Sequence, residues 1–139
     1  MMTQNRDVLA WVAMVSSLAF HVVDEALNDF LSFFNPLVEN MRVRLEFFPM
    51  PTFEFKYWIS GLICVVAIGY LAIPLVRRGA QGIKIVMVVA GALMVLNSLG
   101  HMAASIYMGR VVPGTLSSPL LLVASLCVVV RGLKCRRLS

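Results

Sequence analysis

The residues best suited to chemistry in this sequence are its two histidines and the polar residues near them. His21 is followed by Asp24 and Glu25, and Asn97 precedes His101 by one helical turn. Neutral histidine nitrogens and carboxylate oxygens are ligands of zinc and of non-haem iron. The same groups also act as general acids and bases. Either chemistry requires a fold that brings these residues together.

The composition indicates a membrane protein. The chain has 139 residues, of which 60% are hydrophobic and 14% charged, and its mean hydropathy is +0.86. An average soluble domain carries about 25% charged residues, so this chain has too few to cover its surface. The net charge of +5 does not indicate nucleic-acid binding, because the basic residues cluster beside apolar segments as topology determinants do.

Four apolar segments predict an all-α fold, a four-helix transmembrane bundle forming a single domain over residues 1–139. The predicted helices cover residues 8–28, 57–76, 85–108 and 111–130. About 20 residues are needed to cross the hydrocarbon core of a bilayer. The first apolar run, residues 8–20, is shorter than that, so it spans only by continuing through the carboxylates. The absence of glycine and proline between Val8 and Asn35 favours this continuation.

Residues 33–55, between the first two predicted helices, are too polar to span. They combine phenylalanines with alternating acids and bases, and Pro36, Pro49 and Pro51 interrupt them. Aromatic residues favour the membrane interface. We therefore expect an interfacial segment with a short helix between these prolines, capping the outer face. A plain loop is the alternative.

The basic residues predict the orientation. Eight lie on the side of the termini and four on the other side: Arg6, Arg77, Arg78, Lys84, Arg131, Lys134, Arg136 and Arg137, against Arg42, Arg44, Lys56 and Arg110. The positive-inside rule makes the first side cytoplasmic. We expect a multi-pass integral membrane protein with both termini in the cytoplasm.

Depth and helical face bring the polar residues together. Counting from the cytoplasmic ends, His21 lies about 20 Å into its helix, and Asn97 and His101 lie about 18 and 24 Å into theirs. On each helix these residues share a stripe with other polar side chains: Ser17, Asp24, Glu25 and Asn28 on the first, and Ser105 on the third. Two polar stripes at one depth are expected to face each other, because carboxylates facing lipid are costly.

The facing set predicts a site near the outer leaflet. His21, His101 and Glu25 are the candidate metal ligands for zinc or iron, and Glu25 is preferred over Asp24 because its side chain is longer. Asp24, Glu25 and Asn97 are the candidate catalytic residues, as general base, as a partner of a histidine or as a donor to an oxyanion. Alternatively, the cluster is structural and holds two helices in register.

The order of these motifs resembles that of the HXXEE-domain membrane proteins. H-x-x-D-E at residues 21–25 is followed by N-x-x-x-H at residues 97–101, then by Tyr107 and by Pro113-Gly114. Asp24 departs from the motif, which has a glutamate there; a carboxylate is kept with a shorter reach. The resemblance implies a small bacterial protein, and hence the inner membrane. It supports the choice of residues and implies no reaction.

Three functions remain open from the sequence. The first is an integral membrane metalloenzyme that hydrolyses a lipidic substrate with the help of a divalent metal. The second is a metal-free acid–base isomerase or cyclase of an isoprenoid. The third is a non-enzymatic bundle with a structural polar cluster. The expected partner is a membrane lipid or another apolar small molecule, with no nucleic acid; the sequence leaves the oligomeric state open.

Overall fold

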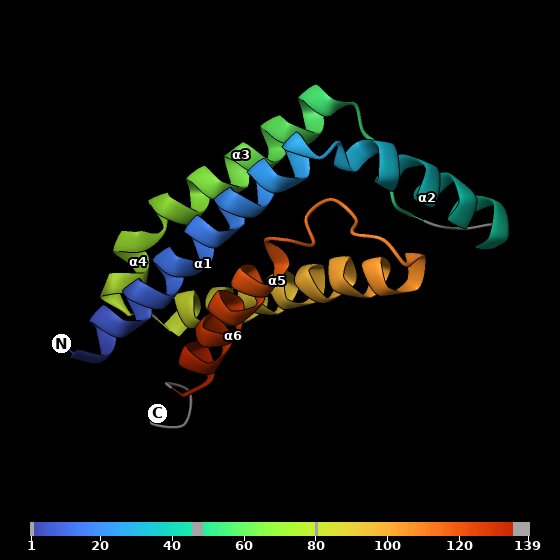
Figure 1. Ribbon diagram of the computed structural model, residues 1–139. Helices are drawn as coiled ribbons and strands as arrows, with labels where there is room; N and C mark the ends of the chain where they lie inside the picture. Colours follow the sequence, from blue (N-terminus) through green and yellow to red (C-terminus); the bar gives the residue numbers. More distant parts are fainter. Residues whose placement is uncertain (1, 46–48, 80, 135–139) are drawn as a thin grey trace.

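The computed structural model describes residues 2–45, 49–79 and 81–134, and all of the regular structure within them is helical. The helices follow the order α1 (Met2–Leu27), α2 (Phe30–Leu45), α3 (Phe55–Leu71), α4 (Ile73–Arg78), α5 (Gln81–Met108) and α6 (Ser118–Lys134). The N-terminus and the end of α6 lie at the same end of the molecule, and α2 extends from the opposite end (Figure 1).

Three helical stretches are long and apolar enough to cross a membrane: Gln4–Leu27, Phe55–Arg78 and Gly82–Met108. They correspond to the first three predicted spans and indicate a membrane protein. The second stretch comprises α3 and α4, which meet at Ala72. Pro74 breaks the regular hydrogen bonding there because it has no N–H. Trp11 of α1 donates its indole N–H to the Gly69 carbonyl just before this break, at 2.7 Å.

The fourth predicted span, residues 111–130, begins too early. α6 starts at Ser118 and has 17 residues, fewer than the about 20 that a straight crossing needs. The preceding residues form a loop, because Gly109 and Gly114 adopt positive φ angles of 63° and 86° and Pro113 lies between them. The four-helix transmembrane bundle therefore stays a prediction, although α6 packs along both α1 and α5.

The interfacial segment also differs from the prediction. Its helix, α2, begins at Phe30 rather than between the prolines, and Pro36 lies inside it. The break between α1 and α2 falls at Asp29, whose φ of 53° is a left-handed conformation that aspartate tolerates better than most residues. Pro36 removes only one hydrogen bond, so the helix continues through it. Residues 46–48 of the predicted segment lie outside the described residues.

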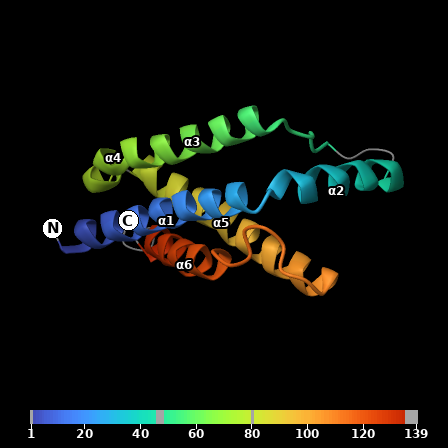
Figure 2. The same ribbon diagram turned by 45° about the horizontal axis from the view of Figure 1, so that its top comes forward.

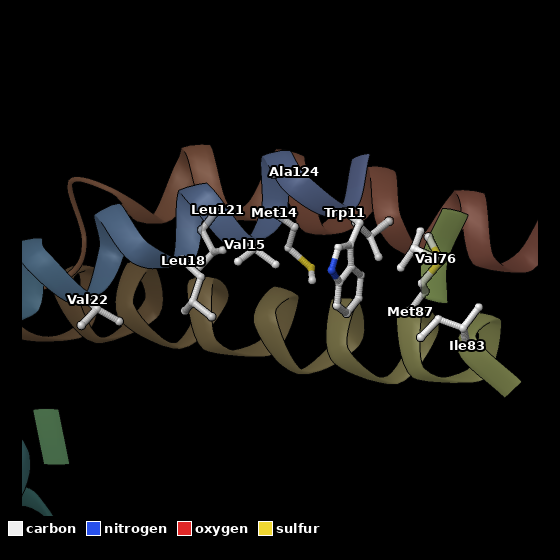
Figure 3. Packing of buried hydrophobic residues seen from close by; sticks show 11 residues of the cluster. Trp11, Met14, Val15, Leu18, Val22, Val76, Ile83, Met87, Leu121 and Ala124 are labelled. Atoms are coloured by element: carbon white, nitrogen blue, oxygen red, sulfur yellow. The ribbon is translucent and has the colours of Figure 1, made fainter. Parts of the chain in front are cut away.

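The core is formed where α1, α4, α5 and α6 meet. α1 and α5 run in the same general direction but diverge. After the α5–α6 loop, α6 runs back toward the end of the molecule where the N-terminus lies (Figures 1 and 2). Figure 3 shows the apolar side chains buried there: Trp11, Met14, Val15, Leu18 and Val22 of α1, Val76 of α4, Ile83 and Met87 of α5, and Leu121 and Ala124 of α6. This packing holds α1, α5 and α6 together.

A buried ionic cluster closes this core at the end where the N-terminus and the end of α6 lie. Asp7 of α1 is 3% exposed and accepts from Arg131 Nε of α6 at 2.7 Å and from Lys84 Nζ of α5 at 3.3 Å. One carboxylate thus ties three helices together near the termini. Removing one partner of such a cluster leaves a buried charge uncompensated. Arg131 and Lys84, which the sequence indicates as topology determinants, are therefore also structural.

Candidate metal centre

Three side chains converge at the end of the core opposite the termini. His21 and Glu25 lie one turn apart on α1, and His101 lies on α5; their exposed fractions are 1%, 6% and 7%. Glu25 Oε1 is 3.0 Å from His101 Nε2 and 3.5 Å from His21 Nε2. One nitrogen or oxygen atom from each residue lies within 4.8 Å of the other two. The structure thus brings together the three residues whose types and depth predict a metal site.

The loop between α5 and α6 contacts both imidazoles on the side opposite Glu25, through their Nδ1 atoms. His101 Nδ1 lies 2.7 Å from the Pro113 carbonyl oxygen, and His21 Nδ1 lies 2.8 Å from Ser117 Oγ. The two rings meet edge to face, with centroids 4.9 Å apart. Gly114 fits against them without a side chain. This loop compensates for the divergence of α1 and α5, which share few contacts of their own.

The hydrogen bonds fix the position of the proton on each ring. A carbonyl only accepts, so His101 donates through Nδ1 to Pro113. Ser117 spends its one hydroxyl proton on an acceptor, Asp24 Oδ2 at 2.6 Å or the Gly114 carbonyl at 3.1 Å. Its oxygen is then left to accept from His21 Nδ1. Both imidazoles therefore present Nε2 to Glu25.

This arrangement is typical of metal-binding histidines, which donate their second ring N–H to a carbonyl or carboxylate. It also brings two electron-rich atoms close together. Nε2 of His101 and Oε1 of Glu25 both carry lone pairs, and at 3.0 Å they repel unless a cation lies between them. A proton or a metal ion between the two atoms would remove this repulsion. A metal ion corresponds to the metalloenzyme, and a proton to the metal-free acid–base enzyme.

Asp24 lies beside the cluster rather than in it. Its Oδ2 accepts from the Ser117 backbone N–H at 3.1 Å and from the Ser117 hydroxyl, and its Oδ1 accepts from Asn28 Nδ2 at 2.9 Å. The carboxylate therefore anchors the α5–α6 loop to α1. It reaches His21 only through Ser117.

Asn97 contacts the cluster directly. Its Nδ2 donates to His21 Nε2 at 3.0 Å, which agrees with a proton on the other nitrogen of that ring. An ion bound at Nε2 would take the place of this hydrogen bond. The Asn97 amide would then be free to donate to a group bound at the same ion.

Aromatic side chains of α2 and α3 cover one side of the cluster. The Phe30 ring lies 5.4 Å from the His101 ring between centroids, and it stacks on Trp58 of α3 at 5.8 Å. These rings help to bury the two histidines, and electrostatic interactions are stronger in such a buried environment. The break at Asp29 makes this possible, because it turns α2 so that Phe30 lies over α5.

Sequence reasoning did not identify Ser117, Phe30 or Trp58 as members of the site. The sequence contains the Pro113-Gly114 pair, but nothing in it shows that the chain folds back onto the histidines at this point. Ser105, in the polar stripe of the third predicted helix, holds the loop instead of the site. Its hydroxyl accepts from the Val112 N–H at 3.0 Å and lies 2.6 Å from the Thr115 hydroxyl.

The comparisons with known proteins bear on the family. No curated protein and no solved structure matches the chain. Residues 11–129 match a family described as proteins of unknown function with an HXXEE motif. The match includes every residue of the cluster and the whole α5–α6 loop, and the motif itself falls on His21-Val22-Val23-Asp24-Glu25. The chain thus belongs to the HXXEE family.

Proposed function

We propose that His21, Glu25 and His101 bind one divalent metal ion, and that the protein is a membrane-embedded metal-dependent hydrolase of a lipidic substrate. The observation that carries the proposal is the pair of Nε2 atoms aimed at one carboxylate oxygen, each with its Nδ1–H held by the α5–α6 loop. Two histidines and one carboxylate are a ligand set of catalytic zinc and of non-haem iron.

The ligand set leaves room for chemistry. Three protein ligands leave a position for water or a substrate oxygen, and a metal held there ionises water near neutral pH or polarises a carbonyl. Asn97 is placed to donate to an oxyanion at this position. Asp24 holds the loop through Ser117 and so positions His21. The apolar helices around the cluster support a lipidic substrate.

A second candidate is a metal-free acid–base enzyme, such as an isomerase or cyclase of an isoprenoid. It is favoured by His101, which lies between two acceptors, the Pro113 carbonyl and Glu25. A proton shared by His101 and Glu25 would satisfy both contacts and supply a buried acid. Among the described residues every buried side-chain nitrogen and oxygen has a partner, which also fits a purely structural cluster.

Metal analysis of the full chain, purified in mild detergent, tests the proposal. After incubation with Zn²⁺, or with Fe²⁺ under anaerobic conditions, and removal of excess ion, we expect about one ion per chain by elemental mass spectrometry. Co²⁺ should give the visible absorption bands of a low-coordinate nitrogen and oxygen site. Protein that keeps its fold but retains none of these ions would contradict the metal proposal and leave the acid–base enzyme.

We also propose that both termini face the cytoplasm, with the metal centre near the outer leaflet. The support is the eight-to-four distribution of basic residues, and, for a bacterial protein, the membrane is the inner one. In a chain whose three native cysteines are replaced, Asn40→Cys on α2 should react with an impermeant maleimide added to intact cells. Arg78→Cys should react only after the membrane is opened. The reverse labelling pattern would invert the topology.

A further inference from the structure

A cavity lies beside the proposed metal centre, at the C-terminal ends of α1 and α5. Its volume is about 330 Å³, within the range of small-molecule sites. It is lined by the break between α1 and α2 and by the start of the α5–α6 loop. The residues that carry its polar character are Asp24, Asn28, Asp29, Ser32 and Arg110. No function considered above uses this cavity.

The cavity carries both signs of charge. Arg110 supplies a guanidinium, which has no ion-pair partner among the described residues. Asp29 supplies a carboxylate that accepts only the Ser32 hydroxyl within the described part of the chain. Asp24, by contrast, already accepts three hydrogen bonds from Ser117 and Asn28. Arg110 and Asp29 are therefore the two charges with the fewest protein partners, and a ligand that forms an ion pair with each of them carries both an anionic and a cationic group.

The position of the cavity selects the kind of zwitterion. The two membrane-spanning stretches that border it end at Leu27 and Met108. Asp29 and Arg110 follow each of these ends by two residues, so they lie at the level where lipid headgroups meet the protein. Asp29 also holds a left-handed backbone conformation, which places it at the rim of the cavity.

We propose that this cavity binds the headgroup of a zwitterionic phospholipid, with the phosphate at Arg110 and a primary ammonium at Asp29. Asp24 and Pro113 belong both to the cavity wall and to the support of the two histidines. A lipid held here lies beside the metal centre. The inference rests on the proposed hydrolase only in naming this lipid as the substrate class; binding of the headgroup stands without it.

Native mass spectrometry of the full chain in detergent tests the proposal. With equal amounts of dioleoyl phosphatidylethanolamine and dioleoyl phosphatidylglycerol, we expect the first lipid to be retained about fivefold more, which is what one partly exposed charge pair contributes. Asp29→Asn should remove this preference, because asparagine keeps the backbone conformation and loses the charge. Arg110→Gln should weaken retention of both lipids about fivefold.

Two matched controls distinguish this cavity from general surface charge. Glu39→Gln and Arg44→Gln remove the same charges from exposed positions on α2 outside the cavity, and neither should change lipid retention. Equal retention of the two lipids by the unaltered chain would overturn the proposal. So would unchanged retention in the Asp29 and Arg110 variants.

Two further measurements distinguish a lipid from a soluble ligand, and failure of the lipid proposal from failure of the metal proposal. Free O-phosphoethanolamine should not displace the lipid, whose acyl chains add apolar contact; binding of this free ester in place of the lipid would show a soluble ligand and overturn the lipid. His21→Ala should lose metal and keep the lipid preference. A chain that binds metal without preferring phosphatidylethanolamine would contradict this inference alone.

Discussion

Replacing either His21 or His101 by alanine is expected to lower metal affinity by about 100-fold or more. Loss of residues that merely support a ligand already costs 10–100-fold, and the loss of one ligand out of three costs more. Glu25→Gln should have a similar effect, because a neutral amide is a poor ligand at nearly unchanged volume. Elemental analysis of the purified full chain, together with competition by a chelator of known affinity, measures the change.

The residues that support the histidines provide a graded test of the same model. Ser117→Ala keeps all three ligands but removes the acceptor of the His21 Nδ1–H and the hydroxyl donor to Asp24, so we expect a loss of about 10–100-fold. Ser125→Ala is the matched control, because Ser125 is equally buried on α6 but donates to the Leu121 carbonyl, away from the site. If His21→Ala lowered thermal stability but left bound metal unchanged, the cluster would be a structural hydrogen-bond network.

The elements that hold the ligands could be predicted because the signals for them are local. An uncharged run of membrane length, a fixed rise per residue and a polar stripe are properties of one helix at a time. They placed His21 and His101 at one depth, and the structure brings these residues together with Glu25. The extent of the first helix, through its own carboxylates, followed from the absence of a breaking residue before Asn35.

The remaining features depend on contacts that the sequence does not express locally. Residues 111–117 carry no charge, as in a span, yet they form a loop, because Pro113 and Gly114 redirect the chain toward the histidines. The sequence has no glycine or proline at the helix break at Asp29, so the break could not be predicted from a helix-breaking residue. Ser117 and Phe30 contact the histidines only because these two turns place them there. Sequence reasoning therefore found the ligands and missed the groups that orient them.

The second large effect is expected at Gly114, where the loop passes closest to the site. A Cβ at this position would lie 2.7 Å from His101 Cε1, 2.8 Å from His101 Nδ1 and 3.0 Å from His21 Cε1. The φ angle of 86° is also unfavourable for a side chain. Gly114→Ala should therefore displace both rings or the loop, lower the free energy of unfolding by about 2–6 kcal/mol and remove most of the bound metal.

Gly109→Ala separates the two causes, because Gly109 has a similar φ of 63° in the same loop but no atom within 4 Å of its Cβ position. It should cost only the backbone strain, about 1–3 kcal/mol, and leave metal binding unchanged. Thermal unfolding in detergent and metal content, measured on both variants, give the comparison. Two variants equally destabilised and equally loaded with metal would mean that the loop does not press on the histidines, and the role assigned to it in orienting the ligands would be wrong.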